Sequence, residues 1–182
     1  LKAVKNAQGV FIDRVLRRFD AVIAIGPAVE TVLRTPPTRW MLGATPVFVI
    51  VNGIDEDRFA FDPAARARLR QQLGIPADAP VLMSASRLHV QKGVKDTLSG
   101  FARAREGLPA LQYVIAGAGP AEAELRAHAE ALRQRDAVHF AGAVTRDVLP
   151  QLLSAVDVFA FTSHRREGLA LGPLEAAASG LP

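Results

Sequence analysis

The chain has 182 residues, a length that allows one domain or one domain with part of another. Apolar residues make up 49% and charged residues 22%, which excludes a disordered tail, a collagen and a small disulfide scaffold. The net charge of +4 is not gathered into a basic patch interleaved with aromatic residues, so no nucleic-acid partner is expected. There is no cysteine, which rules out thiolate chemistry and fits a cytoplasmic location.

The first part of the chain has the pattern of an incomplete α/β sandwich. Apolar residues at three- to four-residue spacing predict a helix over Ala3–Phe19. The short apolar run Ala21–Ile25, closed by glycine and proline, predicts a buried strand, and that proline then opens a helix over Pro27–Arg34. The Thr-Pro-Pro-Thr stretch at 35–38 breaks the chain before a second strand over Pro46–Val51.

The rest of the chain alternates strands and helices. The strands are predicted over Val81–Ser86, Leu111–Ala116, Val138–Phe140 and Val156–Phe161. The helices are predicted over Pro63–Leu73, after Gly93, from Pro120, over Pro150–Ala155 and over Leu174–Ser179. This alternation predicts βαβ units and an α/β fold with a Rossmann-like, doubly wound parallel sheet. Ligands of such sheets bind at the carboxyl ends of the strands.

Charged and glycine-rich loops follow three of these strands. Arg87 and Lys92 lie five residues apart, where a phosphate would feel both charges and a helix N-terminus. Gly117 and Gly119 would let the backbone approach a ligand. Carboxylates after the last strand suit sugar or ribose hydroxyls and would repel a phosphate, so we assign the phosphates to the two cations. No histidines and carboxylates show metal-ligand spacing, and no bound metal is expected.

At this point a resemblance becomes specific, because seven motifs occur in a fixed order. They are Asn52-Gly53-Ile54-Asp55 with Phe59, Arg87-Leu88 with Lys92-Gly93, Gly117–Pro120, Val138–Gly142, Ala155–Phe159, Glu167-Gly168 with Glu175-Ala176, and Gly180-Leu181-Pro182. In this order and spacing they resemble the GT-B glycosyltransferases of family 4, from about Asp13 to the end of the chain. That family transfers a sugar from a nucleotide-diphosphate donor with retention at the anomeric carbon, usually without a metal.

The resemblance implies a role for each candidate residue. Arg87 and Lys92 would hold the diphosphate and stabilise the leaving group, and Glu167 would face the donor sugar, which makes these three the expected catalytic residues. Glu175 would bind the ribose. The other expected donor contacts are Gly117, Gly119, Phe140, Gly168, Leu169, Ala170 and Leu171. The implied partners are a nucleotide-sugar donor and a carbohydrate, lipid-linked or small-molecule acceptor, with no cofactor and no metal.

Departures from the family pattern leave other functions open. Ala170 and Ser86 stand where glycine is usual, Val51 where proline is usual and Gly26 where serine is frequent. A Cβ on Ala170 could crowd the phosphate, which favours a non-catalytic nucleotide-sugar binding module. A GT-B nucleotide-sugar epimerase is a further alternative. A nicotinamide dehydrogenase ranks low, because Glu122 stands where its third glycine would be.

The resemblance also divides the chain. Residues 1–51 would be the C-terminal part of the acceptor-side Rossmann-like domain, and residues 52–182 the nucleotide-sugar donor domain without its C-terminal part. We therefore expect about half of an enzyme, inactive alone, with weak donor binding and an exposed apolar sheet surface. The location is expected to be cytoplasmic, with peripheral contact to the inner face of a membrane left open for the missing N-terminal domain.

Overall fold

The computed structural model describes residue 15, residues 17–165 and residues 167–182. The chain divides into two compact units, the first comprising the residues up to Gly53 with Glu167–Leu169, and the second the residues from Ile54 onward apart from that segment. The sequence placed the division two residues earlier, after Val51, and kept Glu167–Leu169 with the second part. The helix expected over Ala3–Phe19 lies largely outside the described residues.

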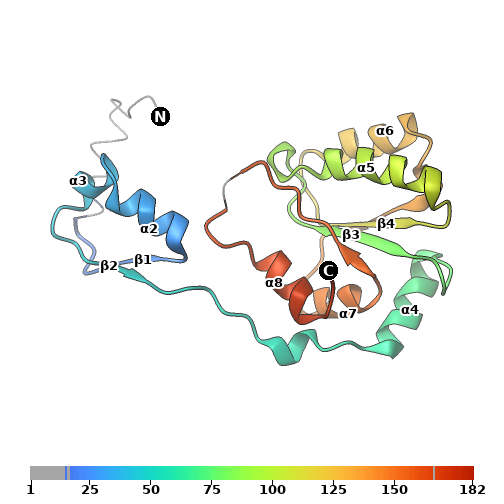
Figure 1. Cartoon of the computed structure of the whole chain (residues 1–182), viewed down its shortest axis with the longest axis horizontal. Coiled ribbons are helices and arrows are strands. Elements are labelled where there is room, and N and C mark those ends of the chain that lie inside the picture. Colours follow the sequence, from blue (N-terminus) through green and yellow to red (C-terminus); the bar gives the residue numbers. More distant parts are fainter. Residues whose placement is uncertain (1–14, 16, 166) are drawn as a thin grey trace. The chain divides into compact units, whose positions relative to one another are not determined.

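The first unit is a small α/β element (Figure 1). Strands β1 (Val22–Ala24) and β2 (Val47–Val49) pair in parallel, and helix α2 spans Pro27–Arg34 as predicted. Helix α3 (Thr38–Leu42) was not predicted, because the Thr-Pro-Pro-Thr stretch at 35–38 was interpreted as a chain break that leads into a loop. The two prolines responsible for that reading precede the helix, at positions where a missing backbone N–H costs no helical hydrogen bond.

The expected exposed apolar surface is present on the two-stranded sheet. Ile23 and Phe48 are neighbours in register, and each keeps 56% of its surface exposed. Ala24 on β1 and Leu42 on α3 are fully buried, so the unit does have a small interior. The exposed residues form one apolar patch of the kind that marks a contact surface.

The second unit contains a four-stranded parallel sheet in the order β5-β4-β3-β6. Its strands are β3 (Val81–Ala85), β4 (Gln112–Ala116), β5 (Val138–Gly142) and β6 (Val158–Phe159). The predicted doubly wound parallel sheet is therefore confirmed. The chain steps outward from β3 through β4 to β5 and then returns to the other side of β3, which places the topological switch point between β3 and β6.

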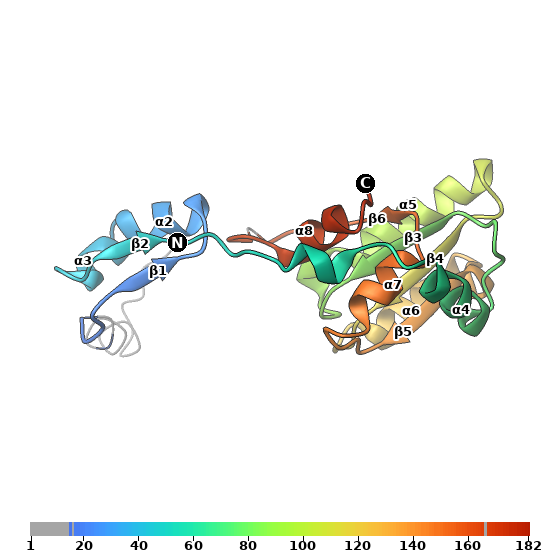
Figure 2. The same ribbon diagram turned by 90° about the horizontal axis from the view of Figure 1, so that it is seen from below.

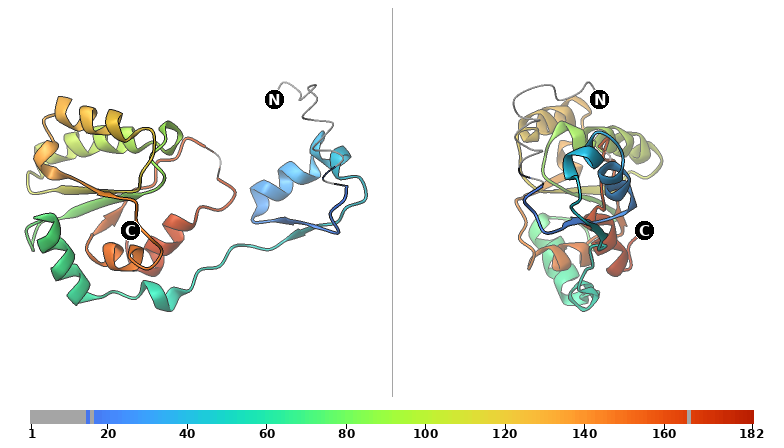
Figure 3. Two further views of the ribbon diagram at one scale, coloured as in Figure 1. Left: turned by 180° about the vertical axis from the view of Figure 1, so that it is seen from behind. Right: turned by 90° about the vertical axis from the view of Figure 1, so that its left-hand side faces the viewer.

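Helices cover both faces of this sheet (Figures 1 and 3). One face carries α5 (Val94–Gly107) and α6 (Glu122–Ala131), preceded by the short 3-10 turn η2 (Val90–Lys92). The other face carries α4 (Pro63–Leu73), α7 (Leu149–Ser154) and α8 (Leu171–Ala178), which lie in front of the sheet in Figure 2. Two further 3-10 turns are η1 (Glu56–Phe59) and η3 (Arg135–Ala137).

Strand β4 shows why the sequence of a central strand of this sheet is a continuous apolar run. Tyr113 and Ile115 pack into the cluster under α5 and α6, whereas Val114 and Ala116 pack into the cluster under α4, α7 and α8. All four side chains are at most 3% exposed. A strand buried on both faces loses the polar–apolar alternation of a half-exposed strand.

A buried hydroxyl pair ties the strand ends together. The Tyr113 hydroxyl donates to Ser84 Oγ at 2.9 Å, and Ser84 Oγ donates to the Ala160 carbonyl at 3.0 Å. Burial raises the pKa of Tyr113 to about 12, so the phenol remains a donor at any physiological pH. These bonds join β4, β3 and the residue that follows β6.

An ionic network fixes the opposite, amino-terminal end of β3 and β6. Asp157 accepts from Arg66 Nη2 at 2.6 Å, from Arg70 Nη2 at 2.8 Å and from the Val81 amide at 2.8 Å. Arg70 is only 2% exposed and also donates to the carbonyls of Ala155 and Ala79. One carboxylate therefore joins α4 to the starts of two strands.

Candidate functional site

A cavity of about 380 Å³ lies at the carboxyl ends of the strands of the second unit. Its walls come from the ends of β3 and β4, the segment after β5, the start of α7 and the first turns of α8. The lining residues are Ala85, Ser86, Arg87, Ala116, Gly117, Ala118, Ala143, Val144, Leu149, Gly172 and Glu175. This is the place where doubly wound sheets bind ligands.

Arg87 supplies the positive charge of the cavity. It follows β3 directly, and its side chain is exposed. Its guanidinium has no hydrogen-bond or ion-pair partner among the residues that the structure describes. An unpaired guanidinium offers five donors in a planar fork, which matches the oxygens of a phosphate.

Gly117 lies at the floor of the cavity and brings two loops together. Its φ is +133°, and a Cβ added to it would lie 1.8 Å from the Ser86 carbonyl oxygen. Leu88 donates to the Ala118 carbonyl at 3.0 Å, which joins the same two loops. Gly117 therefore allows the two loops to pack closely against each other. A close approach of its backbone to a ligand remains a prediction.

Gly119 lies next to this contact but does not line the cavity. A Cβ on it would lie 2.2 Å from the Leu88 carbonyl oxygen. That carbonyl accepts from the Ala121 amide at 3.1 Å, a contact outside the helix itself. Helix α6 begins at Glu122, two residues after the predicted Pro120.

Glu175 supplies the negative charge. It lies in the second turn of α8, half-buried, and no described residue pairs with its carboxylate. Gly172, in the first turn of the same helix, also lines the cavity. A helix N-terminus carries partial positive charge from its free amides, so the cavity combines an anion-attracting wall with a carboxylate suited to hydroxyl groups.

The predicted Lys92 is near this region but is not among the residues that line the cavity. It ends η2, is half-buried, and its amide donates to the His89 carbonyl at 2.8 Å. The structure thus brings Arg87 and Glu175 to one cavity. Lys92 lies five residues after Arg87 on the same loop and does not line that cavity.

Phe140 is not among the residues that line this cavity, and its contact with the donor stays a prediction. Its ring packs against the cluster under α5 and α6, and the Arg126 guanidinium carbon lies 4.1 Å from the ring centroid. The motif had suggested a donor contact because Phe140 lies near the end of β5. The alternation of side chains along a strand turns this residue toward the opposite face.

The remaining predicted residues belong to the segment before α8. Glu167, Gly168 and Leu169 group with the first unit and are described apart from the cavity. Ala170 precedes α8 with φ −77° and ψ 124°, an extended conformation that any residue adopts, and Leu171 is the first residue of the helix. Alanine in place of the usual glycine therefore introduces no backbone strain.

Of the residues that line the cavity, only Arg87, Gly117 and Glu175 are among the predicted site residues, and the wall after β5 was missed entirely. Ala143, Val144 and Leu149 line the wall after β5, and their side chains offer only apolar contact. No motif marks them, and the one available signal was their position after a predicted strand.

No group of three or more histidine, aspartate or glutamate side chains in the described ranges could hold a metal ion. Within the same part of the chain, no helix combines the length and apolar character needed to cross a membrane.

The family described as glycosyl transferases group 1 matches residues 65–182. The chain therefore belongs to this family of GT-B-fold glycosyltransferases. Its fold agrees with that assignment: the crystal structure of Anabaena HepE with UDP and glucose superposes with a TM-score of 0.81 at 28% identity, over 96% of this chain and 46% of that one. The sucrose-phosphate synthase of Thermosynechococcus elongatus gives a TM-score of 0.75 at 26% identity, over 98% and 45%.

Sequence relatives extend the comparison. A GDP-mannose-dependent alpha-(1-6)-phosphatidylinositol monomannoside mannosyltransferase from Mycolicibacterium smegmatis is 36% identical in an alignment of 136 positions that covers 71% of this chain. The chain spans only 35% of the length of that relative.

Proposed function

We propose that this chain forms the donor-binding part of a glycosyltransferase that transfers a sugar from a nucleoside-diphosphate donor to an acceptor with retention of configuration. One observation carries the proposal: the Arg87 guanidinium and the Glu175 carboxylate line the same cavity at the carboxyl ends of the strands, and neither pairs with any residue that the structure describes. Cation and carboxylate suit the two polar parts of such a donor, the diphosphate and the ribose.

The chemistry follows from the charge that develops when the bond to the sugar breaks. Negative charge grows on the departing diphosphate, and a cation already in place stabilises the transition state without reorganisation. In this proposal Arg87 and Lys92 supply that charge, assisted by the backbone at the start of α8. Glu167 faces the donor sugar, no side chain of the chain acts as a nucleophile, and the two cations take the place that a metal ion would hold.

The donor base, the sugar and the acceptor are open within this proposal. The Mycolicibacterium relative is described as GDP-mannose-dependent, and Anabaena HepE was crystallised with UDP and with UDP-glucose. We propose a nucleotide-sugar donor of this class and a carbohydrate, lipid-linked or small-molecule acceptor. The cysteine-free composition agrees with the cytoplasmic location that we propose.

We further propose that residues 1–182 by themselves bind the donor weakly and do not transfer sugar. The active site of a GT-B enzyme lies between two domains, and the chain spans 35% to 46% of the relatives and structures compared above. The binding-module alternative rested on crowding of the phosphate by the Cβ of Ala170, and the glycosyltransferase family match and the named relatives do not favour it.

Replacing Glu175 by alanine is expected to weaken binding of the preferred nucleoside diphosphate by about tenfold to a hundredfold, because charge-assisted hydrogen bonds contribute ~1.5–3 kcal/mol. Calorimetry on the full-length protein with UDP, GDP and ADP measures this. The sharper comparison uses the 2′,3′-dideoxy nucleotide: the wild type should bind it less well than the parent nucleotide, and Glu175→Ala should bind both alike.

The exposed Glu106, on α5 and away from the cavity, provides the control. Glu106→Ala should bind nucleotide as the wild type does. Equal nucleotide affinity in the wild type and in Glu175→Ala would remove Glu175 from the ribose site.

A further inference from the structure

The loops that follow β3 and β6 contact each other at the switch point between these two strands. From there they continue to helices on opposite faces of the sheet. The loop after β3 contains Arg87 and Lys92 and continues into α5 on one face of the sheet. The loop after β6 begins at Ala160 and continues toward α8 on the other face. Loops that diverge in this way leave a crevice between them, and ligands of doubly wound sheets bind there.

The inner contact between the loops is a threonine pair, in which Thr97 is buried and Thr162 is exposed. Thr162 Oγ1 lies 2.7 Å from Thr97 Oγ1 and donates to the Gly93 carbonyl at 2.9 Å. Gly93 has a φ of +66°, and a Cβ on it would lie 2.0 Å from the Thr162 carbonyl oxygen. No side chain would fit at this point, so the close contact between the two backbones requires a glycine at position 93.

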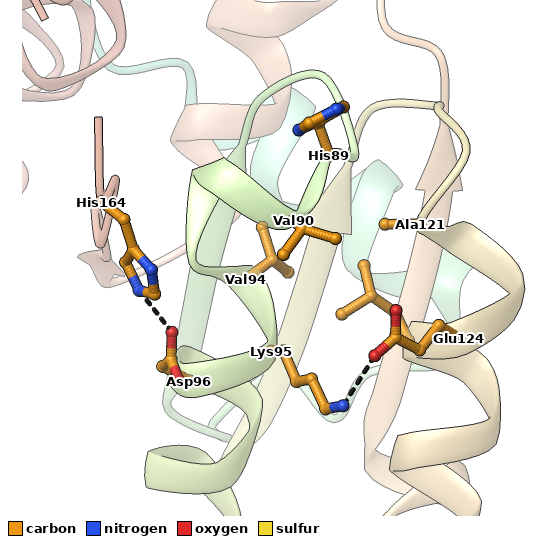
Figure 4. A pocket seen from close by; sticks show the side chains of 9 residues that line it. His89, Val90, Val94, Lys95, Asp96, Ala121, Glu124 and His164 are labelled. Atoms are coloured by element: carbon orange, nitrogen blue, oxygen red, sulfur yellow. Dashed lines mark hydrogen bonds and ion pairs between the residues drawn. The ribbon is translucent and has the colours of Figure 1, made fainter. Parts of the chain in front are cut away.

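The outer contact is made by His164. Its amide donates to the Gln91 carbonyl at 2.9 Å, and its Nε2 lies 2.7 Å from Asp96 Oδ2 in the first turn of α5 (Figure 4). An ionised carboxylate only accepts hydrogen bonds, so Nε2 carries the proton in this contact. Gln91 and Gly93 are the chain neighbours of Lys92, and both of their carbonyls accept from the loop after β6.

An ion pair beside this contact provides an internal comparison. Lys95 Nζ lies 2.6 Å from Glu124, so the neighbouring residue of the same helix turn bonds to α6 and not to the loop (Figure 4). Both pairs line one small pocket of about 120 Å³. Their side chains are similarly exposed, 53% for both members of the Lys95 pair, and 60% and 63% for His164 and Asp96.

We propose that His164 and Asp96 are positioning residues for the proposed diphosphate site. Their bond fixes the loop after β6 on the backbone that flanks Lys92, and thereby orders the chain on both sides of the crevice before the donor binds. The inference rests on the proposed function, because it assigns the pair a role in binding that donor. The Lys95–Glu124 pair has the same chemistry and no contact with the loop, so it should not share the role.

The first measurement tests the geometry without any nucleotide. Hydrogen–deuterium exchange of the full-length protein should show residues 160–165 exchanging about threefold faster in Asp96→Ala than in the wild type, because an exposed hydrogen bond between side chains holds a loop with modest strength. Lys95→Ala should leave that peptide unchanged. Equal exchange in all three proteins would overturn the positioning role.

The second measurement tests the consequence for the donor. His164→Leu should weaken binding of the preferred nucleoside diphosphate by about threefold to fivefold, whereas Lys95→Ala should stay within about twofold of the wild type. His164→Gln places an amide donor near the position of Nε2 and should restore the wild-type affinity. A merely structural histidine would not show this rescue.

The outcomes separate the two claims. A wild-type protein that binds UDP, GDP and ADP with no measurable affinity would contradict the proposed function, and the role in donor binding would fall with it. A wild type that binds one of them, with His164→Leu and Lys95→Ala binding it equally well, would overturn the positioning role alone.

Discussion

Replacing Arg87 by alanine is expected to lower the rate of sugar transfer by the full-length protein by about a hundredfold. The loss of one preorganised donor from a site that stabilises developing charge costs roughly 10²–10³ in kcat. Arg87 lines the cavity, and no described residue competes for its guanidinium. The charge that it faces grows as the sugar leaves, so kcat should fall by more than KM rises.

Steady-state kinetics with the preferred nucleotide sugar measures both constants. Arg103, an exposed arginine of α5 outside the cavity lining, is the control, and Arg103→Ala should retain wild-type kinetics. Arg87→Lys keeps the charge without the planar fork and should lie between alanine and the wild type. If Arg87→Ala transferred sugar at the wild-type rate, the cavity would not be the diphosphate site.

Replacing Asp157 by alanine is expected to reduce the free energy of unfolding by about 2 kcal/mol. The substitution leaves the buried Arg70 guanidinium without its charged partner, and breaking a fully buried pair costs ~3–5 kcal/mol. The Asp157 side chain is 34% exposed, which lowers that cost because water can take over part of the interaction. Denaturant unfolding followed by circular dichroism measures the difference.

Asp147 provides the control for this substitution. It pairs with Arg58 at 2.7 Å, but the Asp147 side chain is 88% exposed. Asp147→Ala should therefore change the free energy of unfolding by less than ~1 kcal/mol. Equal effects of the two substitutions would show that the network around Arg70 does not hold α4 to the sheet.

The same network makes a prediction about pH. Partial burial by itself raises the pKa of Asp157, but the hydrogen bonds from Arg66 and the Val81 amide, with the charges of Arg66 and Arg70, outweigh it and hold the pKa below its ordinary value. The unfolded chain then binds this proton more readily than the folded one. The contribution of Asp157 to stability is complete above the unfolded pKa of about 3.9 and is lost as the pH falls through the lower, folded pKa. Asp157→Ala should lack that part of the acid sensitivity.

Much of the fold followed from local signals in the sequence. The helix Pro63–Leu73 was predicted to the residue, since Pro63 occupies its first turn and Gly74 ends it with a φ of +69°. Strand β6 was predicted as six residues and has two. It is an edge strand with β3 as its one neighbour in the sheet, and beyond Phe159 its loop turns to meet Gly93.

The candidate site was predictable only in part. Arg87, Gly117 and Glu175 converge on the cavity because parallel strands end at one edge of the sheet, a rule that needs no coordinates. Phe140 does not line the cavity, because its side chain packs against the cluster under α5 and α6. The contact of His164 with Asp96 spans 68 residues of sequence, and no local pattern marks it.

The central claim is that the cavity between Arg87 and Glu175 holds a nucleoside diphosphate. The most direct measurement is the crystal structure of the full-length protein with whichever of UDP, GDP and ADP binds most tightly in calorimetry. The account predicts a diphosphate oxygen within hydrogen-bond distance of the Arg87 guanidinium and a ribose hydroxyl on the Glu175 carboxylate. A nucleotide bound elsewhere on the sheet, or no binding of any of the three, would contradict it.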